Sequence, residues 1–277
     1  MPGPDLHLHS TCSDGLLTPG EIVAHALALR LPAIAIADHD SVGGIDPAIV
    51  AAEGTSLIVI PAVELSASMG ERTIHILGYH IDHQDPRLLA RLARLRRGRA
   101  ERATRILHAL ADDGILVELD EGVTSDENAA IGRAHIARAL VRAGHARDMS
   151  DAFARYIGDG APYFAAKDLL TPELAIGWIA DAGGVAVLAH PGLNGVDDLL
   201  PALVASGLAG IEACHASHDE AAVAHYRALA AGFGLIVTGG SDYHGSSREG
   251  GAMGCAAAPD GAVEALAAAA ARQRGHR

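Results

Sequence analysis

Seven short apolar runs alternate with longer segments of helical periodicity along this chain of 277 residues. Such short runs are typical of buried strands, and their alternation with helices is typical of βα units around a parallel sheet or barrel. The length allows one large α/β domain, or a barrel that carries an inserted subdomain. The seven predicted strands span residues 4–9, 33–38, 57–65, 73–79, 185–190, 209–213 and 235–242.

Two helix starts can be placed from the local sequence. In "TPGEIVAHALALR", Thr18 can cap the helix, Pro19 can occupy its first position and Glu21 can complete a capping box. A second start of this kind begins at Thr171, and the helix that follows is expected to end at the glycine pair 183–184.

Residues 84–168 interrupt the alternation, because they show helical periodicity but no strong strand run. We therefore expect a helical insertion subdomain over 84–168, between two strands of a barrel domain made of 1–83 and 169–277. Its arginine-rich run, 87–105, carries leucines on one face. We interpret the run first as the solvated side of an amphipathic helix, with steering of an oligonucleotide as the alternative.

Composition argues against several functions. The net charge of -13 disfavours a broad basic face for nucleic acid, so no duplex DNA partner is expected. The chain lacks a secretory leader pattern and a run of about 18 apolar residues, so no membrane partner is expected. The cysteines Cys12, Cys214 and Cys255 lack CxxC spacing. They suggest neither a disulfide framework nor a thiolate zinc site, and they favour a cytoplasmic location.

Polar side chains recur at the carboxyl ends of the predicted strands, where barrel enzymes place their catalytic groups. In chain order, these candidates are His7, His9, Asp14, His39, Glu64, His75, His190, Asp242 and His244.

The spacing of these residues favours metal binding. Residues i and i+2 of a strand point the same way, so His7 and His9 can hold one ion together, as can Asp242 and His244. Imidazoles and carboxylates without a thiolate suit Zn²⁺, Mn²⁺ or Fe²⁺. Nine ligands are too many for one ion, so two or three divalent metal ions are expected, and Glu64 is suited to bridge them.

The motifs "DLHLHSTCSDG", "AIADHDSVGG", "VELS", "IHILGY", "LAHPG" and "GGSDYHG" resemble, in order, those of the PHP (polymerase and histidinol phosphatase) family. The resemblance implies a distorted seven-stranded (β/α) barrel whose metal cluster cleaves phosphate esters through an activated hydroxide. It also implies three ligand sets: His7, His9, Glu64 and Asp242; Glu64, His75 and His190; Asp14, His39 and His244.

An amidohydrolase-type barrel also opens with an HxH motif, but it usually bridges its metals through a carboxylated lysine. Here the only lysine is Lys167, so this alternative lacks its bridging residue. Cys12 lies between two candidate ligands, and we interpret it as a bystander rather than a nucleophile.

The segment "IGRAHIARALVRAG" resembles the PHP subgroup that hydrolyses nucleoside 3′,5′-bisphosphates and short RNA from its 5′ end. The resemblance implies that Arg133, with His135 nearby, holds the phosphate that is not cleaved; arginine can engage phosphate bidentately. It also implies that His215 or His218 contacts phosphate or protonates the leaving oxygen, a role that suits histidine. Arg248 is a further phosphate candidate.

We therefore expect a metal-dependent phosphoesterase acting on a small nucleotide, such as a nucleoside 3′,5′-bisphosphate, or on the 5′ end of short RNA. Histidinol-phosphate phosphatase is an alternative, although its small substrate would not need the insertion with Arg133. A non-catalytic metal-binding PHP module is another alternative, but all nine ligand positions are filled.

Overall fold

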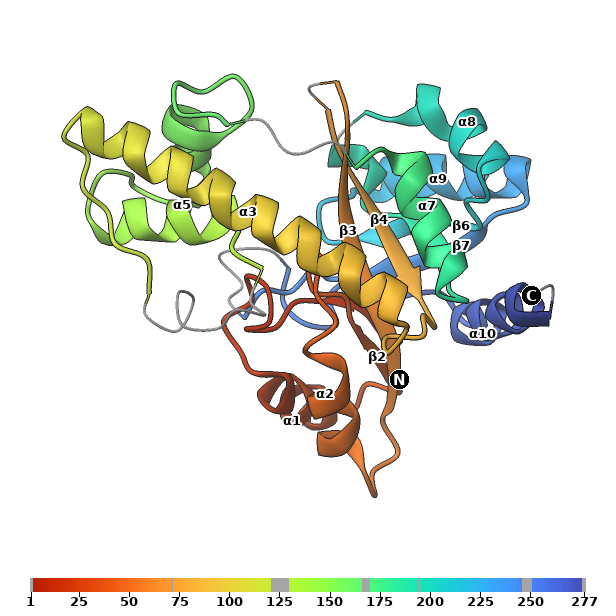
Figure 1. Ribbon diagram of the computed structural model, residues 1–277. Coiled ribbons are helices and arrows are strands. Elements are labelled where there is room, and N and C mark those ends of the chain that lie inside the picture. The colour runs from red at the N-terminus through yellow and green to blue at the C-terminus, as the bar shows by residue number, and fades with distance from the viewer. Residues whose placement is uncertain are drawn as a thin grey trace.

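A seven-stranded sheet lies at the centre of the computed structural model, which describes residues 2–70, 72–120, 130–165, 170–193, 195–245 and 251–275. Within these residues, the spatial order of the strands follows the chain (Figure 1). The strands are β1 (Asp5–Leu8), β2 (Ala33–Ile36), β3 (Ile58–Met69), β4 (Arg72–Tyr79), β5 (Val185–Leu188), β6 (Gly210–His215) and β7 (Ile236–Gly240).

The first and last strands come together and nearly close the sheet into a barrel. The His9 N–H donates to the Tyr243 carbonyl over 3.0 Å. The Asp5 carboxylate accepts hydrogen bonds from the N–H and hydroxyl of Ser241, at 2.9 and 2.6 Å. Gly240 lies so close to β1 that an added Cβ would collide with that strand. The carboxyl ends of β1 and β7, and the polar residues that follow them, are therefore neighbours.

Strand β4 runs antiparallel to both of its neighbours, whereas the other neighbouring pairs are parallel. Only residues 70–71 separate β3 from β4, and a link this short can join only antiparallel strands. The seven-stranded barrel is as expected, and β4 therefore interrupts the parallel order that is typical of βα units. The pairing places His75 opposite Ser66 and diagonal to Glu64, so these two predicted metal ligands, His75 and Glu64, share one face.

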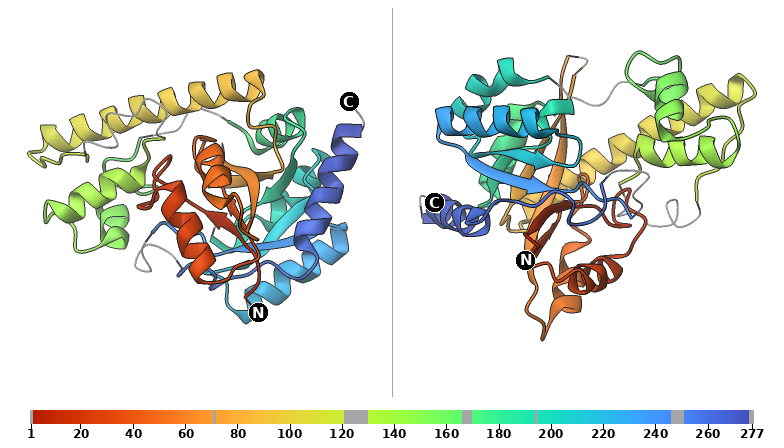
Figure 2. Two further views of the ribbon diagram at one scale, coloured as in Figure 1. Left: turned by 90° about the horizontal axis from the view of Figure 1, so that it is seen from below. Right: turned by 180° about the vertical axis from the view of Figure 1, so that it is seen from behind.

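Helices cover the outside of the sheet (Figure 2). Both predicted helix starts are confirmed, because Thr18 and Glu21 form a capping box and Thr171 caps the later helix. No helix of the described segments combines the length and apolar character needed to cross a bilayer. The helices around the barrel are α1 (Pro19–Ala28), α2 (Ile45–Ala52), α7 (Pro172–Asp181), α8 (Leu200–Ala205), α9 (Glu220–Phe233) and α10 (Ala262–Gly275).

Helix α3 (Pro86–Asp112) extends from the barrel toward a group of shorter helices (Figure 1). Its first half packs Leu88 and Leu92 into the core that covers β3 and β4. Its second half contributes Ile106 and Leu110 to a separate core with α5 (Arg133–Arg142). The short α6 (Met149–Ala152) and a π-helical turn, Phe153–Ile157, complete this group. The described part of the insertion is thus helical, while its boundaries at 84 and 168 stay a prediction.

We expect Gly240→Ala to lower the free energy of unfolding by more than about 1 kcal/mol, because the new methyl group would overlap β1 where the barrel closes. Gly232→Ala in α9 is the matched control. Nothing lies within 4 Å of the added methyl there, and alanine favours a helix by about 0.5–1 kcal/mol. Urea denaturation of both variants measures the difference. Equal stability of the two variants would contradict the close packing of β1 on β7.

Candidate metal centre

The Glu64 carboxylate lies at the centre of the nine predicted ligands and is fully buried. Its two oxygens face nitrogen atoms from four other segments of the barrel. The separations from the nearest Glu64 oxygen are 2.7 Å for His75 Nδ1, 2.8 Å for His39 Nδ1, 3.1 Å for His190 Nε2, 3.3 Å for His9 Nε2 and 3.4 Å for His7 Nε2.

The remaining ligands adjoin this group on the side of β1 and β7. Asp242 Oδ1 lies 3.0 Å from His9 Nε2. Asp14 Oδ1 lies 3.4 Å from His244 Nε2, and Asp14 Oδ2 lies 3.9 Å from His39 Nε2. The rings of His9 and His244 stack with their centroids 4.1 Å apart. The structure therefore brings all nine residues into one continuous cluster.

The cluster fits divalent metal ions. Asp14 Oδ1, Glu64 Oε2 and His75 Nδ1 are buried and make no well-formed hydrogen bond among the described residues. Burying polar atoms in this state is costly unless something binds them. Atoms that could ligate metal lie within 4.8 Å of one another in four sets: His9, Asp14, His39 and His244; His7, His9 and Asp242; His39, Glu64 and His75; and His7, Glu212 and His215, the last two of which lie outside the nine predicted ligands. Imidazoles and carboxylates in this arrangement suit several transition metals.

Three buried carboxylates behind the ligands were missed in the sequence analysis. Asp38 accepts hydrogen bonds from Ser10 and Ser13 at 2.6–2.7 Å and fixes the loop after β1. Asp5 anchors the end of β7, as described above, and Glu212 on β6 contacts two ligand residues. The available signal was an acidic residue within or directly beside an apolar strand run, where a charge needs a partner.

Burial lowers the pKa of some histidines of the cluster, while nearby carboxylates raise the pKa of others. Burial lowers the pKa of His9 to about 4 and that of His75 to about 3, so both rings are neutral and free to bind metal at pH 7. Burial alone would raise the pKa of Glu64, but the surrounding histidines hold it well below its usual value. Burial opposes protonation of His244 too, yet Asp14 and Asp242 raise its pKa to about 9.

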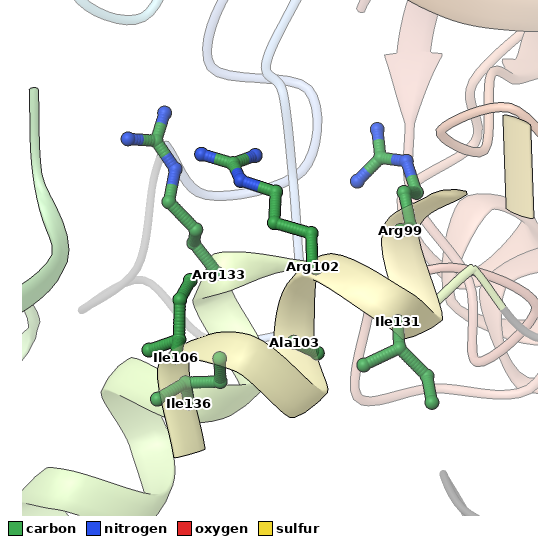
Figure 3. A pocket seen from close by; sticks show the side chains of 8 residues that line it. Arg99, Arg102, Ala103, Ile106, Ile131, Arg133 and Ile136 are labelled. Carbon is green, nitrogen blue, oxygen red and sulfur yellow. The ribbon is translucent and has the colours of Figure 1, made fainter. Parts of the chain in front are cut away.

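A small pocket between α3 and α5 contains the predicted phosphate residue Arg133. Its guanidinium and those of Arg99 and Arg102 point to the same side, away from the isoleucines (Figure 3). Arg133 donates to Asp159 at 2.6 Å. Arg102 is buried, donates from Nε to a carbonyl, and keeps Nη2 without a hydrogen-bond partner in the described residues. The lining residues are Arg99, Arg102, Ala103, Ile106, Ile131, Gly132, Arg133 and Ile136.

Arg99 connects this pocket to the metal centre. Its Nε donates to Asp40 at 2.5 Å and its Nη2 to Ser66 at 2.6 Å. A methyl group added to Gly132 would lie 3.2 Å from Arg99 Nη1 and 3.9 Å from Asp14 Oδ2. The interpretation of the arginine run as simply a solvated face is therefore wrong for Arg99 and Arg102, which are drawn inward because α5 and the barrel pack against them.

The other predicted residues differ in how their side chains are engaged. His135 is buried and its Nδ1 accepts from the Gly132 N–H, so it caps α5. His218 has both nitrogens occupied, by the Ala213 carbonyl and the Gly192 N–H. Arg248 lies outside the described residues.

His215 differs from His218 because one of its nitrogens remains available. Its Nδ1 accepts from the Ser217 N–H, while Nε2 is buried without a hydrogen bond, 3.6 Å from Asp242 Oδ2. His215 thus faces the metal centre with a nitrogen that no described residue occupies.

Comparisons with known proteins identify the family of this chain and its fold. The family model for the PHP domain matches residues 5–159. The chain is 37% identical to a 3′,5′-nucleoside bisphosphate phosphatase of Chromobacterium violaceum over 90% of each chain. It is 38% identical to the 5′-3′ exoribonuclease Rnm of Escherichia coli over 68% of this chain and 65% of that one. A crystal structure from Bifidobacterium adolescentis, described as a metal-dependent phosphoesterase, matches with a TM-score of 0.87 and 32% identity over 96% of both chains.

We expect metal binding to release protons at pH 7. Despite the opposing effect of burial, nearby carboxylates raise the pKa values of His7, His190 and His244 in the metal-free chain, the last to about 9, so the protonated form of His244 persists at neutral pH. Metal ligation needs the neutral rings, and apparent affinity should therefore rise with pH up to about 9. Calorimetric titrations of Mn²⁺ in two buffers of different ionisation enthalpy measure the release.

His244→Gln should release about one proton fewer per chain than the wild type, whereas the exposed His225→Gln should match it. Identical binding heats in both buffers would contradict the predicted proton release.

Proposed function

We propose, on the premise that this chain belongs to the PHP domain family, that it removes a phosphate ester from a nucleotide which carries a second phosphate group. The chain is a metal-dependent phosphoesterase, as its family and relatives indicate. The proposal concerns the substrate, a nucleoside 3′,5′-bisphosphate, and the residues that select it. The 5′ end of short RNA presents the same chemical groups and is a second substrate of the same site.

The observation that carries this proposal is the buried Arg102 guanidinium in the pocket that Arg99 connects to the metal centre. Burial, followed by the nearby charges of Arg133 and Arg99, lowers the pKa of Arg102 to about 9. It remains protonated at neutral pH, in a pocket where, among the described residues, three guanidinium groups face two paired carboxylates. Arg99 and Arg133 have the carboxylates of Asp40 and Asp159, whereas no carboxylate in the described part of the chain forms an ion pair with Arg102. A phosphate dianion would supply the missing counter-charge and accept bidentate hydrogen bonds.

The other phosphate group, whose ester bond is cleaved, would be held at the metal centre. Two or three divalent ions, Mn²⁺, Zn²⁺ or Fe²⁺, held by the nine ligands would supply Lewis acidity toward phosphate oxygens and an activated water as the nucleophile. The protein's own part is to orient these ligands around Glu64 and to keep the ester phosphate within reach of them. Because the net charge is -13, the arginine pocket would also provide local attraction for an anionic substrate.

We assign protonation of the leaving oxygen to His215. In the protonated ring both nitrogens carry hydrogen: Nδ1 can donate to the Ser217 hydroxyl oxygen 2.8 Å away, and Nε2 directs its proton to the metal centre. Transfer of the Nε2 proton from this imidazolium to the departing sugar oxygen would leave a neutral imidazole and a neutral hydroxyl product. His218 instead hydrogen-bonds two backbone groups, the Ala213 carbonyl and the Gly192 N–H, and would support the loop after β5.

The alternatives fit the pocket less well. Histidinol phosphate carries a single phosphate and would leave Arg102 without an anionic partner. The bisphosphate phosphatase matches this chain over 90% of both lengths, which favours the small substrate over longer RNA. A non-catalytic module would have no need for nine converging ligand residues or for a guanidinium pocket beside them.

We expect Arg102→Gln and Arg133→Gln each to lower kcat/KM for a nucleoside 3′,5′-bisphosphate by about 10- to 100-fold, because charge-assisted hydrogen bonds to the second phosphate are lost. The same variants should leave kcat/KM for the nucleoside 3′-monophosphate within about twofold. Steady-state phosphate release with metal-loaded enzyme gives both values. Arg97→Gln, an exposed arginine of the same helix, is the matched control and should change neither.

Equal losses on the two nucleotides would refute the pocket's role in binding a second phosphate. Parallel assays with histidinol phosphate and a 5′-phosphorylated RNA oligomer rank the substrates. A preference for histidinol phosphate that survives Arg102→Gln would overturn the proposed substrate.

His215→Gln should lower kcat for the bisphosphate by about 10²-fold, in line with the loss of a general acid. The loss should shrink for p-nitrophenyl phosphate, whose leaving group departs without protonation. His225→Gln, exposed in α9, controls for loss of an imidazole. An equal loss on both leaving groups would argue against proton transfer by His215.

A further inference from the structure

Glu212 is a fully buried carboxylate on β6 that lies outside the nine-residue ligand set. Its oxygens are 3.1 and 3.2 Å from His7 Nδ1, and Oε2 accepts the backbone N–H of His190 at 2.8 Å. A buried carboxylate is costly unless it is paired and hydrogen-bonded. Both of its partners here are ligand residues, one from β1 and one from the end of β5.

The contact with His7 determines how that ring meets the metal centre. A carboxylate can only accept, so His7 Nδ1 carries the hydrogen and the Nε2 lone pair is left for the cluster. Nε2 is the atom that lies 3.1 Å from His9 Nε2 and 3.4 Å from Glu64 Oε2. Glu212 therefore selects the tautomer in which His7 can ligate.

The contact with His190 acts on the backbone. His190 has a φ of 24°, a conformation that residues with a side chain seldom adopt. The hydrogen bond from its N–H to Glu212 helps to hold this turn, which presents His190 Nε2 at 3.1 Å from Glu64 Oε1. One carboxylate thus restrains two ligands from different strands.

We propose that Glu212 is a positioning residue that sets the affinity of the metal centre by fixing the tautomer of His7 and the backbone of His190. The proposal rests on the metal centre of the proposed function. Outer partners of metal-binding histidines commonly change metal affinity by about 10- to 100-fold when they are removed. Glu212 itself binds no metal in this assignment, because its oxygens are engaged by the two ligand residues.

Glu212→Gln tests this assignment with little change of shape. The amide can still accept from His190, but an NH₂ group directed at His7 would favour hydrogen on Nε2, the wrong atom for ligation. We expect the dissociation constant for Mn²⁺, measured by competition with a chromophoric chelator, to rise about 10- to 100-fold. The number of ions bound at saturation should stay that of the wild type, and the metal concentration for half-maximal activity should rise in parallel.

Two further variants make the result specific. Glu212→Asp keeps the charge and should recover part of the affinity, and it also serves if Glu212→Gln does not fold. Glu220→Gln, an exposed glutamate at the start of α9, should bind metal as the wild type does. Nitrogen-15 NMR of the metal-free protein, at a pH high enough to leave the His7 ring neutral and with His7→Gln to assign the signals, should show a change of His7 tautomer in Glu212→Gln.

An affinity within twofold of the wild type, or an unchanged His7 tautomer, would overturn the positioning role. Loss of one whole ion with the others still tightly bound would make Glu212 a ligand and also refute the proposal. Failure of the wild type to bind divalent metal is a separate outcome, because it would remove the proposed function itself.

Discussion

The Glu64 carboxylate is the point on which the architecture of the site depends. It is fully buried and is approached by histidine nitrogens from β1, β4 and the loops after β2 and β5. A carboxylate can occupy such a place only if charged or hydrogen-bonding groups surround it. The barrel supplies those groups from segments far apart in sequence, so closure of β1 on β7 and reversal of β4 are both conditions for the site.

The clustering of the nine candidate ligands was predictable because the alternation of side chains along a strand is a local property. His7 and His9 follow the two-residue period of a strand, and the carboxyl ends of parallel strands meet at one end of a barrel. The reversal of β4 was less visible, since it depends on a link of two residues rather than on the apolar pattern. His75 nevertheless reaches the site, because its antiparallel pairing places it diagonal to Glu64.

The supporting residues were harder to predict, because their roles depend on contacts across the fold. Glu212 and Asp38 are single acidic residues whose partners come from other strands and loops. Arg99 and Arg102 lie in a run of arginines whose pattern is typical of a solvent-exposed helix face. Helical periodicity alone does not predict which face another helix or the barrel will cover. Packing of α5 and the barrel against that helix decided which arginines became buried.

Helix α3 packs into two separate hydrophobic cores and so fixes the distance between them. Its first half is held in the core around β3 and β4, its second half in the core with α5, and Arg99 ties its middle to the loop after β2. A continuous helix of 27 residues is stiff over about 40 Å. It therefore holds the helical core around α5, and with it the arginine pocket, at a fixed position relative to the metal centre. The substrate site in such a scaffold is open to adjustment through one helix, while the barrel that carries the predicted metal ligands stays unchanged.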